Sequence, residues 1–176
     1  DEYSGADGAL TSGERLSKLR RWDAPVVMSV EFGASVPQAQ QEADRAEISA
    51  YAGRLGRAAN HRVRMGTNGN FSVLVLNENE RRSIGPRLEA LVPGISRGVV
   101  HSIETFAPSS YCVVYTFSQG NSPVLSRAVA IIRAEHPDRL RKSCIHEELA
   151  QGLGLGNDSP AARPSIFNES TPICTK

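Results

Sequence analysis

Five stretches of the chain carry hydrophobic patterns that are typical of β-strands. The first, residues 26–32, is apolar at its start and alternates apolar with polar positions towards its end. The third is strongly apolar, and an Asn-Gly turn at 68–69 separates it from the second. We therefore predict strands at 26–32, 60–66, 71–76, 111–117 and 124–132.

Two further stretches have helical character. Residues 35–57 carry a stripe of small residues, mostly alanine, which favours close packing on a sheet, and Ser35 is placed to cap the helix. The second helix is expected at 137–153, with Pro137 in its first turn and Gly154 as the left-handed residue after its end. The order of strands and helices predicts an α+β fold.

The remaining segments set the domain organisation. Residues 1–24 are expected to form an N-terminal arm with a short helix at 14–22 whose Trp22 anchors it to the body. Residues 25–176 are expected to form a single domain, interrupted by a long excursion at 78–110 with one short helical turn. Long excursions in compact domains are often functional or mobile.

Composition excludes two classes of partner. The 176 residues are 40% hydrophobic and carry a net charge of +1, so there is no electrostatic case for binding nucleic acid. No apolar run reaches the length of a membrane span. The chain begins at Asp1 without a signal peptide, as a mature exported protein or a trimmed sequence does.

The stretch at 147–158 carries the strongest candidate chemistry. Laid without gaps on the metzincin zinc signature, His-Glu-x-x-His-x-x-Gly-x-x-His, it matches the Glu at Glu148 and the Gly at Gly154. Glu147, Gln151 and Asn157 stand at the three histidine positions. Because Glu147 and Gln151 are four residues apart on a helix, they are neighbours, as two zinc ligands on one helix must be.

The residue types change what this site can hold. Zinc favours imidazole and thiolate, whereas carboxylate and amide oxygens suit calcium, magnesium or manganese. A divalent metal held by Glu147, Gln151 and Asn157 or Asp158 is therefore one interpretation, with Glu148 as general base, and zinc is doubtful. The other interpretation, which we favour, is that Glu147 and Gln151 bond to neighbouring backbone and that the protein has no cofactor.

His146 and the three cysteines complete the candidates. His146-Glu147 looks like the start of a His-Glu motif, but the fifth position is Ala150, so we expect a structural histidine rather than a ligand. Cys144 falls on the site side of the last helix, where an adjacent strand could bring Cys112 close, and we expect these two to form a disulfide with Cys174 left over. Three buried thiols are the alternative in a reducing compartment.

The run 144–151, followed by Leu153-Gly154-Leu155, Asn157-Asp158 and Arg163-Pro164-Ser165-Ile166-Phe167-Asn168, resembles a bacterial family of unknown function. That family includes exported proteins and candidate lipoproteins, which implies a periplasmic or extracellular location, with a lipid anchor on the precursor as an option. A more distant resemblance is to metzincin-like metalloproteases of the zincin fold. It implies a mixed five-stranded sheet with a backing helix, a cleft-edge strand at 111–117 and a C-terminal active-site-type helix.

These observations favour a zincin-like protein with a degenerate metzincin motif that binds a peptide or an envelope protein without catalysis. Binding along the edge strand 111–117 would add a strand to the sheet. The alternative is a metal-dependent, peptidase-like hydrolase with the oxygen ligands named above. A purely structural envelope component is a third possibility.

Overall fold

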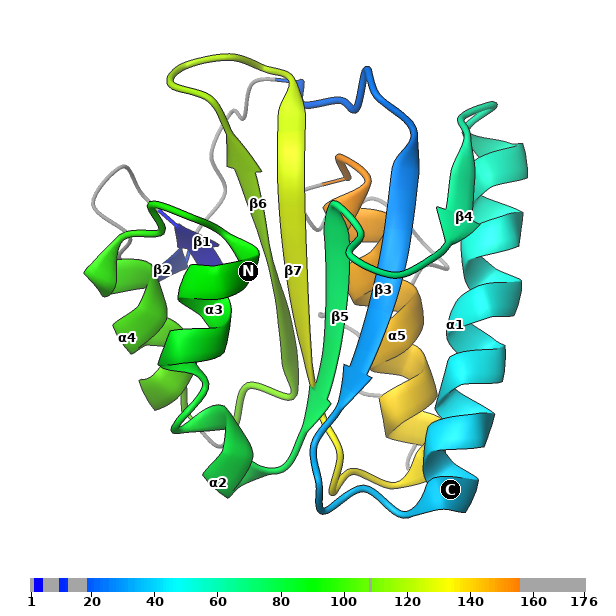
Figure 1. Ribbon diagram of the computed structural model, residues 1–176, viewed down its shortest axis with the longest axis vertical. Coiled ribbons are helices and arrows are strands. Elements are labelled where there is room, and N and C mark those ends of the chain that lie inside the picture. Colours follow the sequence, from blue (N-terminus) through cyan, green and yellow to red (C-terminus); the bar gives the residue numbers. More distant parts are fainter. Residues whose placement is uncertain (1, 5–9, 13–18, 108, 156–176) are drawn as a thin grey trace.

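The two most buried strands, β5 (Phe71–Leu76) and β7 (Leu125–Arg133), lie side by side in the sheet, and apart from Ser126 and Arg127 their residues are buried on both faces. Strands without a polar alternation need cover on both sides, so helices must pack above and below them. The computed structural model describes residues 2–4, 10–12, 19–107 and 109–155, and in them helices cover both faces of the sheet (Figure 1).

The sheet has five strands in the order β4-β3-β5-β7-β6. β3 (Val26–Phe32) pairs in parallel with β4 (Val63–Met65) and with β5, and β5 pairs in parallel with β7. β6 (Cys112–Ser118) pairs antiparallel with β7 and forms the outer edge. The predicted α+β fold with a mixed five-stranded sheet is confirmed.

One face of the sheet carries α1 (Gln38–Ala58) and α5 (Asp138–Gly152). Ile48 and Ala52 of α1 and Ile145 and Leu149 of α5 are at most 1% exposed and belong to one apolar core with the strands. Complete burial of such side chains stabilises the fold by about 1.5–3 kcal/mol for each large one. This face positions α5, which carries the candidate motif.

The other face carries the segment between β5 and β6, where the sequence predicted only a short helical turn. It contains α2 (Glu78–Arg81), α3 (Gly85–Leu91) and α4 (Arg97–Thr105), which bury Leu88, Val99 and Ile103 in a second core. Asn77 caps α2 in a full capping box with Glu80, and Ser96 accepts a hydrogen bond from the Val99 N–H at the start of α4.

The N-terminal arm differs from its prediction. β1 (Glu2–Ser4) and β2 (Leu10–Ser12) form an antiparallel pair in the segment expected to be a loose arm. Of the helix predicted at 14–22, residues 14–18 lie outside the described part, and residues 19–22 are not helical. Arg21 instead forms a β-bridge with Val124, just before β7: its N–H donates to the Pro123 carbonyl at 3.1 Å and its carbonyl accepts from the Leu125 N–H at 2.7 Å.

Trp22 anchors this segment to the body. Its ring is 6% exposed and stacks on Phe71 with the centroids 6.5 Å apart, and its Nε1–H donates to the Gly152 carbonyl at 2.9 Å. Gly152 allows the close approach of α5 to the sheet, since a Cβ there would lie 2.4 Å from Phe71. Gly154 has φ +121° after the helix, as predicted for a residue at that position.

Candidate functional site at the junction of α5 and β6

A buried ion pair fixes the position of α5 against α1. Arg141 donates from Nε to both carboxylate oxygens of Asp44 at 2.8 and 2.9 Å, and the two side chains are only 4% and 7% exposed. Arg141 also donates to the His136 carbonyl and to Asp138 at the helix start. Charged groups are buried at this depth only when their hydrogen bonds are satisfied, so this pair locks the two helices together.

His146 lies on the same side of α5, facing α1. Its Nε2 is 2.7 Å from Oε1 of Glu47 and 3.2 Å from Arg54, and its ring stacks on Tyr51 at 4.0 Å between centroids. The hydrogen bond from His146, together with Lys142, lowers the pKa of the Glu47 carboxyl below its ordinary value of 4.5. The arrangement is that of a structural histidine in a charged network.

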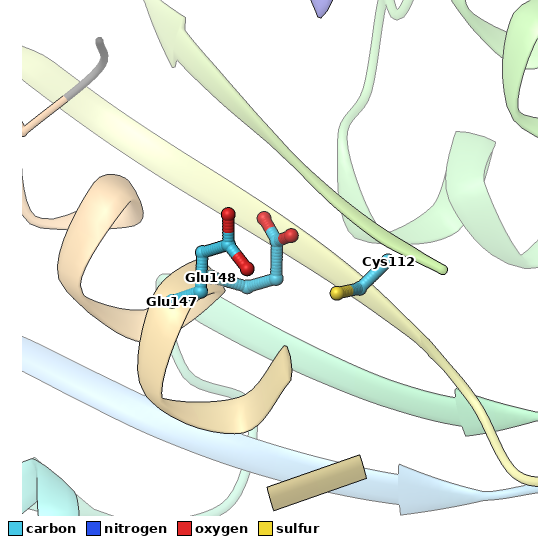
Figure 2. A group of neighbouring side chains, drawn as sticks. All are labelled: Cys112, Glu147 and Glu148. Carbon is cyan, nitrogen blue, oxygen red and sulfur yellow. The ribbon is translucent and has the colours of Figure 1, made fainter. Parts of the chain in front are cut away.

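Glu147 and Glu148 project from the other side of α5, towards the start of β6. A carboxylate oxygen of each and the Sγ of Cys112 all lie within 4.8 Å of one another, and Figure 2 shows the two carboxylates side by side, with Cys112 across from them. Glu148 is 3% exposed and Glu147 is half-buried. Each of them makes a further interaction within the chain. Two ionised carboxylates at this spacing repel each other, and a bound cation or a proton relieves that repulsion.

A disulfide joins Cys112 to Cys144, with their Cα atoms 5.8 Å apart. It fastens the first residue of the edge strand to the middle of α5, next to the carboxylates. Because both sulfur atoms are in the bond, neither is a thiolate, and Cys112 in this state is a poor metal ligand. The oxidised cluster therefore offers a metal two carboxylates rather than a mixed sulfur and oxygen set.

The other predicted ligands are placed only in part. Gln151 is half-buried one turn beyond Glu147 and Glu148, and it too has an interaction partner in the chain. Asn157 and Asp158 lie outside the described residues, as does Cys174. The structure thus brings Glu147, Glu148 and the Cys112–Cys144 bridge together at one place.

Sequence reasoning did not single out Asp44, Glu47 or Arg141. A signal was present, because Asp44, Ile48 and Ala52 follow one another at intervals of four and form the buried stripe of α1. A charged residue on an apolar stripe indicates a buried partner of opposite charge. Arg141 is that partner, one turn before Cys144 on the helix that carries the motif.

An aromatic residue flanks the start of β6. Tyr111 is 51% exposed and meets the His136 ring edge to face, with the centroids 5.2 Å apart. Burial lowers the pKa of His136 below its ordinary value of 6.5, so the ring is neutral at pH 7. Two shallow surface hollows lie along α1, both lined by Gly53 and Arg57, and one of them extends to Glu47 and Lys142.

The chain belongs to the family described as "Protein of unknown function (DUF2927)", whose model matches residues 1–174. The expected membership of a family of unknown function is thereby confirmed. Searches of curated proteins and of solved structures found no significant match. No helix in the part of the chain that the structure describes is long and apolar enough to cross a membrane.

Proposed function

We propose that this protein is an exported, zincin-like module that binds an extended peptide or a segment of an envelope protein along β6, without catalysis. The observation that carries the proposal is the position of β6: it is a seven-residue strand at the outer edge of the sheet, antiparallel to its single described neighbour β7. An edge strand presents unpaired backbone donors and acceptors on its outer side, and a peptide can add itself there as a further strand.

Two features around β6 and one at the other edge of the sheet support this site. The disulfide holds the start of the strand to α5, so the edge is pre-organised and little conformational entropy is lost on binding. Half-exposed Tyr111 offers an aromatic contact for a peptide side chain at one end of the strand. At the other sheet edge β4 has three residues, too few for comparable pairing.

The zincin-like part of the proposal is supported by the order of elements. A backing helix follows the first sheet strand, the edge strand β6 lies next to the last helix, and that helix carries Glu148 at the general-base position of the metzincin signature. The positions of the signature histidines carry Glu147, Gln151 and Asn157. The Cys112–Cys144 disulfide supports export, because disulfides persist in oxidising compartments.

The test uses the whole protein and a library of extended heptapeptides. Selected peptides are expected to slow hydrogen exchange of the backbone amides at 112–118 and to leave those at 63–65 unchanged, so that the second edge serves as an internal control. N-methylation of alternate peptide amides should abolish binding, since it removes backbone donors and keeps the side chains. The proposal fails if no heptapeptide binds, if binding leaves exchange in β6 unchanged, or if N-methylated peptides bind as tightly.

A second candidate function rests on the convergence of Glu147 and Glu148. In a metal-dependent hydrolase, Glu147, Gln151 and Asn157 or Asp158 would supply oxygen ligands for a divalent cation, and Glu148 would take a proton from the attacking water. Elemental analysis of the purified protein separates the two candidates. Stoichiometric metal that is lost in Glu147→Ala favours the hydrolase, and no metal, with no thermal shift on adding calcium, manganese or zinc, excludes it.

A further inference from the structure

The Cys112 sulfur and the two carboxylates bring three potential metal donors to one place, and a fourth, the Cys144 sulfur, is bonded to the first. The Sγ of Cys112 and a carboxylate oxygen of both Glu147 and Glu148 lie within 4.8 Å of one another, and the Sγ of Cys144 is bonded to that of Cys112. Three of the donors come from consecutive turns of α5 and one from the edge strand that packs against it. The two elements are fixed by the cores on which they rest, and this brings the donors together.

The spacing of these donors is close to that of a tetrahedral site. Zinc binds sulfur at about 2.3 Å and carboxylate oxygen at about 2.0–2.2 Å, so two ligands of one ion lie roughly 3.3–3.8 Å apart. The carboxylates and Cys112 would need to approach by only about 1 Å, which side-chain rotations allow. Bonded sulfur atoms are about 2 Å apart, too close for both to bind one ion.

The oxidation state therefore decides what the cluster can bind. In the oxidised protein neither sulfur is a thiolate, and two carboxylates alone are a weak site for a thiophilic ion. Reduction gives two cysteines and hence a donor set of two sulfurs and two oxygens. That set suits zinc, which is held by thiolate and carboxylate ligands in four-coordinate sites.

We propose that reduction of the Cys112–Cys144 disulfide converts this cluster into a binding site for a thiophilic divalent cation such as zinc, with Cys112, Cys144, Glu147 and Glu148 as ligands. The bridge then acts as a gate: the cation binds when the bridge is open and is excluded when it is closed. This inference does not rest on peptide binding at β6, and its ligands differ from the all-oxygen set of the hydrolase alternative.

The reductive step is a thiol exchange with a dithiol reductant. Cys112 is half-buried whereas Cys144 is 2% exposed, so the reductant thiolate attacks the Sγ of Cys112, and Cys144 leaves as a thiolate that takes up the proton released by the reductant thiol. The second thiol of the reductant then releases Cys112 and closes the reductant's own disulfide, which transfers two electrons and two protons to the protein. Binding of the cation displaces the two cysteine protons, so its affinity falls as the pH is lowered.

The cation would replace the disulfide as the link between β6 and α5. A reduced protein without metal has lost the covalent connection at the start of its edge strand, and an ion held by ligands from both elements restores it. Reduction followed by metal binding would thus replace the covalent link between β6 and α5 with a metal-mediated link.

The experiment titrates cobalt(II) and zinc anaerobically into the full chain carrying Cys174→Ser, which removes the third thiol. The reduced protein should bind one ion with the thiolate-to-cobalt absorption band, and zinc should protect both cysteines from alkylation. The oxidised protein should bind at least about 100-fold more weakly, since it has lost both sulfur ligands. Equal affinity of the two forms would overturn the proposal.

Variants separate a built site from thiols that bind metal in an unfolded chain. In the reduced protein, Glu147→Gln with Glu148→Gln should weaken cobalt binding by at least about tenfold, because two charged ligands are lost. Glu47→Gln is the matched control, because it changes a carboxylate of α1 that faces the opposite side of α5, and it should leave the affinity for cobalt unchanged. Circular dichroism of the reduced protein with and without zinc reports whether it is folded. Cys144→Ser keeps the Cys112 thiol and removes one sulfur ligand, so it should bind cobalt more weakly than the reduced protein and still depend on Glu147 and Glu148. Binding that ignores the double Glu change, in both forms, contradicts the site.

Discussion

The two polar sides of α5 bring polar groups together in different ways. The side that faces α1, the α1 flank, sets Arg141 against Asp44, and Lys142 and His146 against Glu47, so each carboxylate lies beside a basic side chain. The side that faces β6, the β6 flank, sets two carboxylates beside each other and beside a disulfide. One helix thus carries a complementary charge network and a cluster of like charges.

The difference separates stability from function. The burial of paired charges is explained by the pairing itself, because each group satisfies the hydrogen bonds of the other and the pair fixes the two helices. Two carboxylates that converge at a partly buried place, as Glu147 and Glu148 do, are frequent at binding and catalytic sites. The β6 flank is therefore where a ligand is expected, and the α1 flank is the scaffold that holds it.

The largest effect is expected from breaking the α1 flank at its buried pair. Arg141→Met leaves the Asp44 carboxylate buried without its partner and should lower the free energy of unfolding by about 3–5 kcal/mol. Urea denaturation at pH 7 measures the loss. The double variant Arg141→Met with Asp44→Leu should recover most of it, because it removes both charges. A loss below about 1 kcal/mol for the single variant would show that the pair does not fix α5.

The disulfide of the β6 flank should contribute somewhat less to the free energy of unfolding than the Arg141–Asp44 pair does. Cys112 and Cys144 are 32 residues apart, and opening a loop of that length by Cys112→Ser with Cys144→Ser should lower the free energy of unfolding by about 3–4 kcal/mol. Denaturation under non-reducing conditions measures it, and the reduced wild type is the matched control. Since the change acts largely on the unfolded chain, the cooperativity of the transition should also change. A variant as stable as the oxidised wild type would contradict the bridge.

The carboxylates of the β6 flank should respond more weakly. Glu148→Gln keeps the shape of the side chain and lowers the repulsion from Glu147, but it also weakens the interaction that Glu148 already makes within the chain, so the free energy of unfolding at pH 7 should change by no more than about 1 kcal/mol. Thermal denaturation measures the shift. A loss comparable to that of Arg141→Met would mean that the β6 flank depends on a paired charge in the same way as the α1 flank.

Patterns along the chain were enough to predict most of the sheet, and tertiary packing decided the rest. Strands 26–32 and 71–76 form where the apolar pattern places them, because two-sided burial leaves little choice of position. α4 was missed, although Ser96 caps it and Val99 and Ile103 share its buried side, because nine residues give a short periodic signal. Ser35 was expected to cap α1, but its hydroxyl and N–H donate to Glu80, far away in the sequence.

The position of the site along α5 could be predicted from the sequence, but the burial of its residues could not. The position of Cys144 on the same side of the last helix as the candidate motif follows from helical spacing, because it depends only on the helix. The burial of that side does not follow from spacing, and Cys144 and Glu148 are both 3% exposed or less. α5 packs against α1, β6 and β7 at once, so a polar side of this helix is not a solvent side. A helical wheel contains no information about the neighbours that cover it.

The smallest effect is expected at the rim of the α1 flank. Glu47→Gln removes the partner of His146 and Lys142 and should lower the free energy of unfolding by about 0.5–1 kcal/mol at pH 7, because the pair is partly exposed. The pKa of Glu47 is lowered by folding, so its contribution is complete above its ordinary value of 4.5 and is lost as the pH falls through the lower folded value. Urea denaturation of both proteins from pH 7 to pH 3 should therefore show curves that converge in acid. A difference that does not shrink between pH 7 and pH 3 would mean that Glu47 acts through packing, and the contrast between the two flanks would then rest on Arg141 and Asp44 alone.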